Sequence, residues 1–136
     1  MDTSPGADPA QVFFAAAARG ELALRHCATC NEPAWPVAQF GTTLHACPYC
    51  LCAPLGWMRA SGRGTLHSFA VVHQVYDEAL ASEVPYALAI VELAEGVRTQ
   101  HVRLVDCPLD QLKVGMPVEV VFEEAGGLTI PKFRPV

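Results

Sequence analysis

The sequence has no concentration of positive charge and no long apolar run. Its nine lysines and arginines are scattered over 136 residues, and the formal net charge is −5. A general nucleic-acid-binding protein needs a concentrated positive surface, so this charge pattern argues against that class. The longest apolar run, from Val12 to Ala18, is too short to span a bilayer, and no membrane segment is expected.

The N-terminus lacks the features of a secretory signal. Asp2 precedes any basic residue, and Asp8-Pro9 stands where a signal peptide would be hydrophobic. We therefore expect a cytoplasmic protein, in which cysteines stay reduced. Apolar residues make up 51% of the chain and charged residues 17%, so a core can form.

Composition divides the chain into three segments, with expected boundaries at 1–20, 21–57 and 58–136. The first is a tail followed by a helix, with Asp8 as N-cap, Pro9 at the first helical position and Gly20 after the end. The second holds every cysteine except Cys107. The third alternates β-forming runs with turns.

Four or five strands are expected in the third segment. They are residues 65–75, 86–93, 97–105, 118–123 and 128–133. The run 86–93 is nearly all apolar, which predicts a strand buried on both faces. A segment of this length is small for an immunoglobulin-type sandwich and suits a five-stranded OB barrel. The sequence thus predicts a mainly β fold with an N-terminal helix.

Two C-x2-C pairs, Cys27/Cys30 and Cys47/Cys50, are separated by sixteen residues. This spacing is typical of a zinc ribbon, in which two knuckles bring four thiolates to one metal ion and leave no open position. We predict one structural zinc ion that stabilises a segment too small for its own core. Iron can occupy the same four-thiolate geometry and stays an alternative, as do reduced or disulfide-bonded cysteines.

The other cysteines and the knuckle backbone give further expectations. Cys52 and Cys107 are interpreted as small buried residues, with Cys52 near enough to replace a ligand. The residue after each knuckle often adopts a left-handed backbone. Asn31 tolerates this conformation and Leu51 does not, so the second knuckle is expected to be irregular.

No catalytic constellation is evident, and no catalytic residue is assigned. His67 and His73 would share one face of a regular strand, but no nucleophile or carboxylate is fixed beside them. Phe13 and Phe14 are expected to pack on the domain, with contact to a partner protein as the alternative. Trp35 and Trp57 are interpreted as packing residues.

Several motifs together carry a more specific resemblance, which covers nearly the whole chain from Ala10. They are Phe13-Phe14, Arg19-Gly20-Glu21-Leu22, Arg25-His26-Cys27, Cys47-Pro48-Tyr49-Cys50, Trp57, Ser61-Gly62-Arg63-Gly64-Thr65-Leu66-His67-Ser68-Phe69, Val71-Val72-His73, Pro85-Tyr86-Ala87-Leu88-Ala89-Ile90-Val91, Glu95-Gly96 and Val114-Gly115-Met116-Pro117-Val118. The chain resembles small acyl-CoA-associated proteins that join an N-terminal helix, a rubredoxin-like zinc ribbon and a C-terminal OB-fold, a family long catalogued as a domain of unknown function.

The resemblance implies a role beside thiolase-superfamily proteins, because members of this family act as partners of such enzymes. It implies a non-catalytic accessory subunit or scaffold that binds acyl-CoA and a thiolase-superfamily partner, whose own residues carry the chemistry. Phe13, Phe14, His73 and Tyr86 are the candidate contacts with acyl-CoA or the partner.

Two other functions stay open from sequence. Zinc ribbons and OB barrels both bind single-stranded nucleic acid, and Phe69 and Tyr86 could stack on bases, although the net charge disfavours this function. A small redox protein with iron at the four cysteines is the second. The sequence also permits a homo-oligomer that forms through the helix or an exposed strand edge.

Overall fold

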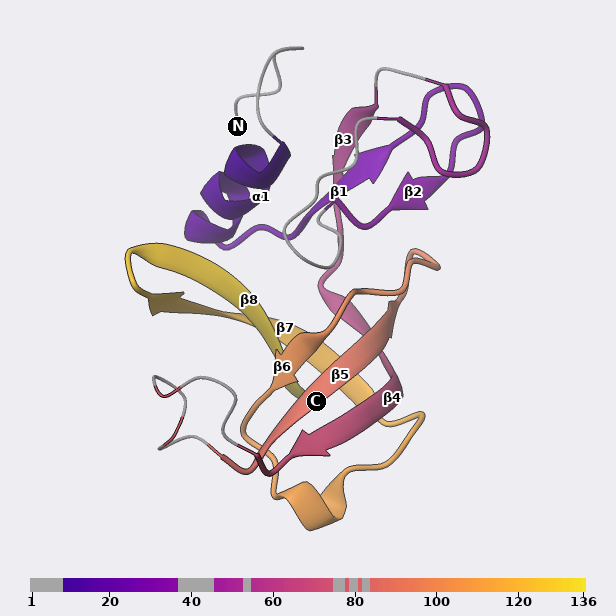
Figure 1. Ribbon diagram of the computed structural model, residues 1–136. Coiled ribbons are helices and arrows are strands. Elements are labelled where there is room, and N and C mark those ends of the chain that lie inside the picture. The colour runs from indigo at the N-terminus through magenta and orange to yellow at the C-terminus, as the bar shows by residue number, and fades with distance from the viewer. Residues whose placement is uncertain (1–8, 37–45, 53–54, 75–77, 79–80, 82–83) are drawn as a thin grey trace.

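The structure is a computed structural model that describes residues 9–36, 46–52, 55–74, 78, 81 and 84–136. Figure 1 shows the N-terminal helix and a small sheet above a barrel. The elements are α1 (Pro9–Ala18), β1 (Ala23–His26), β2 (Pro33–Ala34), β3 (Gly56–Arg59), β4 (Arg63–Val72), β5 (Tyr86–Leu93), β6 (Val102–Leu104), a 3-10 helix (Leu109–Gln111), β7 (Pro117–Ala125) and β8 (Leu128–Pro135). No helix among these residues is long and apolar enough to cross a bilayer.

Helix α1 begins at Pro9, as predicted, while the predicted N-cap Asp8 lies outside the described residues. Pro9 suits this position because its missing N–H has no helical acceptor to lose. The helix ends where Gly20 takes a φ of 75°, with its N–H donating to the Ala17 carbonyl at 2.9 Å. Glycine adopts this left-handed backbone without a steric penalty.

The ribbon sheet has the order β2-β1-β3, with antiparallel pairing on both sides of β1. The buried Arg25 bonds to the backbone at the start of β3. Its guanidinium donates to the carbonyls of Leu55 at 2.6 Å and Gly56 at 3.2 Å, and lies 4.5 Å from the centre of the Trp57 ring. Strand β3 continues past Trp57 to Arg59 and leads directly to the barrel.

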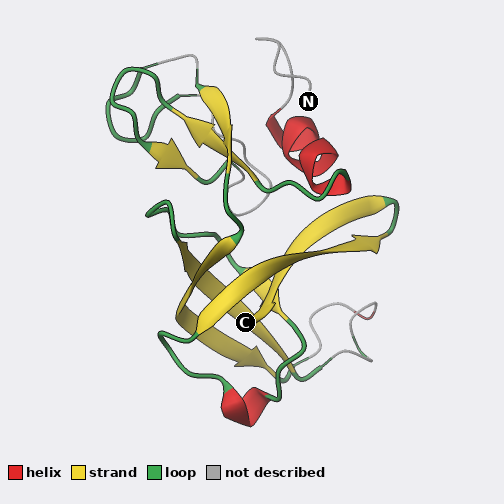
Figure 2. Cartoon of the chain, turned by 180° about the vertical axis from the view of Figure 1, so that it is seen from behind, coloured by secondary structure: helices red, strands yellow, loops and turns green. Residues whose placement is uncertain are grey.

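The remaining strands form a closed barrel in the order β4-β5-β6-β8-β7, with β7 returning to β4. All neighbours are antiparallel except β6 and β8. Closure removes the open sheet edges, which is how small β proteins of this type are stabilised. The predicted five-stranded OB barrel is confirmed, and the hairpin β7–β8 reaches out of it toward α1 (Figure 2).

Strand β5 has the predicted bounds, but the expectation that both its faces are buried is wrong. Burial alternates along the strand, with Ala87, Ala89, Val91 and Leu93 buried and the residues between them half-buried or exposed. A barrel strand has one face in the core and one face outside, so alternation follows from closure. The outward residues Tyr86, Leu88 and Ile90 are apolar as well, which hid the alternation in the sequence.

Three other expectations are corrected. Strand β6 is much shorter than 97–105, because the backbone of Val97 and Thr99 bonds to β5 in a loop that precedes it. The predicted shared face of His67 and His73 is lost, because the register shifts at His67 and β4 ends before His73. Cys52 and Cys107 are half-buried rather than buried.

One further expectation falls mostly on residues that are not described. Residues 76–84 are polar in sequence and carry Asp77, Glu78 and Glu83, which predicts a loop, but this segment lies largely outside the described part of the chain.

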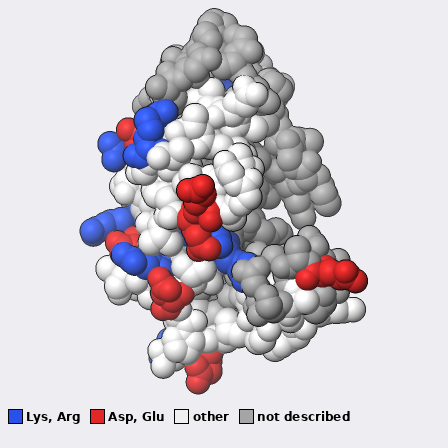
Figure 3. All heavy atoms as spheres, turned by 90° about the vertical axis from the view of Figure 1, so that its left-hand side faces the viewer, with Lys and Arg blue, Asp and Glu red and all other residues white. Residues whose placement is uncertain are grey.

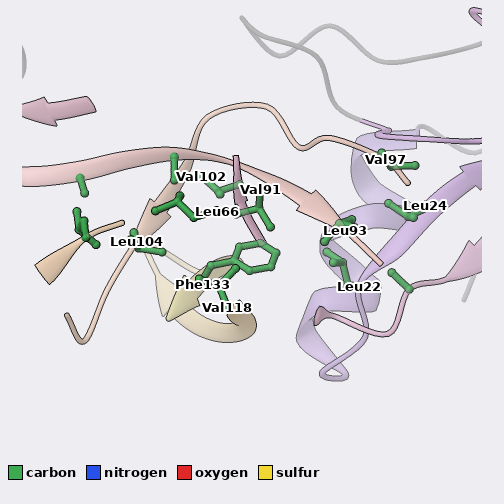
Figure 4. Packing of buried hydrophobic residues seen from close by; sticks show 14 of the residues in the cluster. Leu22, Leu24, Leu66, Val91, Leu93, Val97, Val102, Leu104, Val118 and Phe133 are labelled. Atoms are coloured by element: carbon green, nitrogen blue, oxygen red, sulfur yellow. The ribbon is translucent and has the colours of Figure 1, made fainter. Parts of the chain in front are cut away.

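One apolar core joins the ribbon and the barrel. Figure 4 shows Leu22 and Leu24, from the ribbon side, beside the barrel residue Leu93. Phe133 is completely buried at the centre of the barrel. Because the two parts share this core, separating them would expose Leu22 and Leu24 to water.

Candidate functional site

The four predicted ligands come together at the tips of the ribbon. The sulfur atoms of Cys27, Cys30, Cys47 and Cys50 all lie within 4.8 Å of one another. The Sγ–Sγ distances are 3.6 Å for Cys27 to Cys50 and 3.6 Å for Cys30 to Cys47. A tetrahedral zinc site with Zn–S bonds near 2.3 Å implies sulfur separations of roughly 3.8 Å. The four residues therefore fit a four-thiolate metal ion.

The two knuckles share one backbone design, which corrects the expectation of an irregular second knuckle. The N–H of Asn31 donates to the Cys27 carbonyl at 2.8 Å, and the N–H of Leu51 donates to the Cys47 carbonyl at 2.9 Å. Asn31 has a φ of 62° and Leu51 a φ of 64°. The C-x2-C turn thus imposes a left-handed backbone on Leu51, although this conformation is unfavourable for leucine.

The knuckle backbone prepares the sulfurs for a cation. A hydrogen bond from the Cys30 backbone N–H lowers the pKa of Cys27 to about 6, although burial opposes this change. Burial raises the pKa of Cys47, but backbone N–H donors outweigh it and the net direction is downward.

The second cysteine of each knuckle behaves differently. Backbone N–H donors two residues further along lower the pKa values of Cys30 and Cys50, but burial and the neighbouring thiols outweigh them, so both values are raised. A divalent ion would stabilise all four thiolates together. Its chemistry would be structural, because four protein ligands leave no open position.

The four candidate contact residues do not gather at one site. Phe13 is 4% exposed and packs edge-on against Trp35 at 5.3 Å between ring centres, whereas Phe14 reaches the surface. Tyr86 begins β5, at the end of the barrel opposite to α1 in Figure 1, and His73 is an exposed residue just after β4. Trp35 and Trp57 pack in the ribbon, as predicted.

Two arginines near these groups were missed from sequence. The Arg103 guanidinium lies 4.1 Å from the centre of the Tyr86 ring, and Arg25 bonds to the start of β3 as described above. Arg25 and Trp57 face each other across two strands far apart in sequence. No local pattern indicates such a pair, because the pairing register decides it.

Comparison with known proteins places this architecture in a family. Residues 57–123 match the family model described as ChsH2, C-terminal OB-fold domain. The structure also resembles a solved structure named "Ltp2-ChsH2(DUF35) aldolase", with a TM-score of 0.77 and 31% identity over 97% of this chain and 98% of that one. The chain belongs to the DUF35 family. The resemblance stated from the sequence is thereby confirmed.

Curated relatives of this DUF35 chain are matched over only part of their own length. A "Probable enoyl-CoA hydratase alpha subunit" of Thermomonospora curvata is 35% identical over 124 residues, which are 90% of this chain and 36% of the relative. A "DUF35 domain-containing scaffold protein" of Methanothermobacter thermautotrophicus is 39% identical over 79 residues, or 57% of this chain and 58% of the relative. The chain thus spans between a third and three fifths of these relatives.

Proposed function

We propose that this chain is a non-catalytic subunit or scaffold that binds acyl-CoA and a thiolase-superfamily enzyme. The observation that carries the proposal is the match, over nearly the whole of both chains, to a DUF35 chain in an aldolase named with a second component, Ltp2. The scaffold name of the Methanothermobacter relative supports the non-catalytic role. The thiolase class of the partner comes from the family resemblance.

The side chains support a role without catalysis. The cysteines of the ribbon form a closed set, so a metal ion there would offer no position to substrate. His67 Nδ1 lies 3.4 Å from Ser68 Oγ, but no carboxylate accepts from this imidazole among the described hydrogen bonds. A general base without an orienting partner, on a half-exposed strand, is a poor candidate for activating a hydroxyl.

We propose that the metal is zinc. We also propose that the protein is cytoplasmic, where its thiols stay reduced. A colourless protein with one zinc per chain by elemental analysis would support this assignment. A red protein that contains iron would favour the redox alternative instead.

The nucleic-acid alternative gains no support from the placement of charge. Five of the basic side chains, Arg19, Arg59, Arg98, Lys132 and Arg134, lie within 4.0 Å of a carboxylate, which reduces the positive field that a phosphate backbone requires. Salt-sensitive binding of the purified chain to a single-stranded oligonucleotide would reverse this judgement.

The proposal is tested by affinity purification of the tagged chain from its source organism, with mass spectrometry of the bound proteins. We expect a thiolase-superfamily protein in near-equal amount. Titration of the complex and of the chain alone with acetyl-CoA, for wild type and for His73→Ala and Tyr86→Ala, tests the candidate acyl-CoA contacts. Recovery of nucleic acid and no enzyme would contradict the proposal.

A further inference from the structure

Helix α1 carries no charged residue, and Gln11 is its one strongly polar side chain. Its buried residues, among them Val12, Phe13 and Ala16, pack on the core. The opposite face would normally be polar in a helix at a protein surface. Here that face holds Gln11 near the start of the helix, and its other exposed residues, Ala15 and Ala18, are apolar. A surface face with no charged side chain and two exposed alanines is unusually apolar for a helix that meets water.

The outer face of α1 forms one wall of a groove of about 390 Å³, and the tip of the β7–β8 hairpin forms the other. The groove is lined by Ala10, Gln11, Phe14, Ala15, Ala18, Gly127, Leu128 and Thr129. Leu128 is 49% exposed and adds a large apolar side chain to this wall. Figure 3, viewed from the side of α1 and this hairpin in Figure 1, shows uncharged surface with charged side chains at its borders.

The shape of the groove favours a helix as its occupant. Ala10, Phe14 and Ala18 are spaced four residues apart and form one ridge along α1, and small residues in such a ridge permit another helix to approach closely. Beyond its first turn, the α1 wall offers side chains, because the backbone N–H groups there donate within the helix, so an added strand would pair mainly with the hairpin.

The charge at the rim distinguishes a foreign partner from a second copy of this chain. Glu124 pairs directly opposite Thr129, so the two side chains lie on the same face of the hairpin. Glu123 is next to it and forms an ion pair with Lys132 at 3.1 Å. With a net charge of −5 and an acidic residue at the rim, self-association brings like charges together, whereas basic residues on a partner would be attracted.

We propose that the groove between α1 and the β7–β8 tip receives an amphipathic α-helix of the partner enzyme, apolar on one face and bordered by Lys or Arg. This inference rests on the proposed function, because the partner is the enzyme named there. Binding buries the outer face of α1 and Leu128, and it places basic side chains of the partner near Glu124.

The test compares Ala15→Arg with Val114→Arg in the affinity purification. Arginine is a good helix former, so Ala15→Arg leaves α1 folded while it fills the groove and repels basic groups. Val114 is 67% exposed and lies outside the groove, so its variant carries the same change of charge. We expect Ala15→Arg to capture at least tenfold less partner than wild type, and Val114→Arg to capture the wild-type amount. Circular dichroism checks that both variants are folded.

The identity of the occupant is read from a photo-crosslinking amino acid at position 15. We expect crosslinks to one helix of the partner. Crosslinks to a second copy of the chain, to the chain's own residues, or to a strand of the partner would overturn the inference. So would competition for the groove by acetyl-CoA in place of protein.

The two proposals fail in different ways. If Ala15→Arg retains a thiolase-superfamily partner at the wild-type level, the groove is not the docking site and the proposed function stands. If an enzyme of another class is captured and lost in Ala15→Arg, the groove stands and the proposed function fails. If the wild type captures no protein, both are overturned.

Discussion

The close approach of two backbones at Gly64 gives a quantitative prediction. A Cβ at Gly64 would lie 2.3 Å from the carbonyl oxygen of Glu92 and 3.0 Å from the Cα of Leu93, both backbone atoms of the neighbouring strand. Because ordinary carbon–oxygen contacts begin near 3.4 Å, Gly64→Ala forces β4 and β5 apart by about 1 Å at this point. Overpacking of this kind costs roughly 1–3 kcal/mol.

The structure around Gly64 sets the net magnitude. The adjacent hydrogen bond from the Ala94 N–H to the Arg63 carbonyl, 2.9 Å long, would lengthen, at a cost of about 1 kcal/mol. Alanine also lowers the conformational entropy of the unfolded chain relative to glycine, which offsets about 0.4–1 kcal/mol of this loss in stability. The expected loss is therefore about 1–3.5 kcal/mol, and an unfolding entropy near 2.1 cal/mol/K per residue converts it to a fall in Tm of roughly 4–12 °C.

Gly56→Ala is the matched control, since its Cβ would meet only the His26 carbonyl oxygen at 3.4 Å. Thermal unfolding by circular dichroism is expected to give a Tm within about 2 °C of wild type for this variant, as its small steric and entropic effects oppose each other. Equal Tm values for the two variants would refute the reasoning from backbone contact.

Three further predictions concern the knuckles and the core. Leu51→Gly is expected to stabilise the protein by about 0.5–1 kcal/mol in chemical denaturation, because Leu51 has a φ of 64° and is 80% exposed. A destabilised variant would show that the Leu51 side chain makes a stabilising contact. Phe133→Ala is expected to cost about 3–5 kcal/mol, since the ring is fully buried at the barrel centre, and a loss below 1 kcal/mol in the same measurement would contradict that placement. Cys47→Ser is expected to abolish stoichiometric metal in elemental analysis and to unfold the ribbon, whereas Cys107→Ser keeps the metal; retention of metal by both variants would exclude the four-cysteine site.

Residues whose role is set by local chemistry were predictable from sequence. The C-x2-C spacing identified the four cysteines, because a knuckle brings its two sulfurs together whatever surrounds it. Pro9 and Gly20 marked the ends of α1 through their own backbone preferences. Strand β5 was delimited by its apolar run, since β-forming residues end there at turn signals.

Features set by long-range pairing were not predictable. The bulge at His67 depends on how β4 aligns with β5. It interrupts the alternation of side chains along β4, from which a shared face for His67 and His73 was predicted. The short β6 depends on the loop that bonds Thr99 to β5. The groove beside Phe14 exists because the β7–β8 hairpin extends past the barrel to α1. The sequence of neither element predicts this contact.

The non-catalytic role is tested most directly by measuring acyl-CoA turnover with the purified chain alone, the purified thiolase-superfamily partner alone, and the two together. We expect no turnover by the chain alone, and a change in the activity or soluble yield of the partner when the chain is present. Robust acyl-CoA turnover by the chain alone would contradict the proposal that it is an accessory subunit.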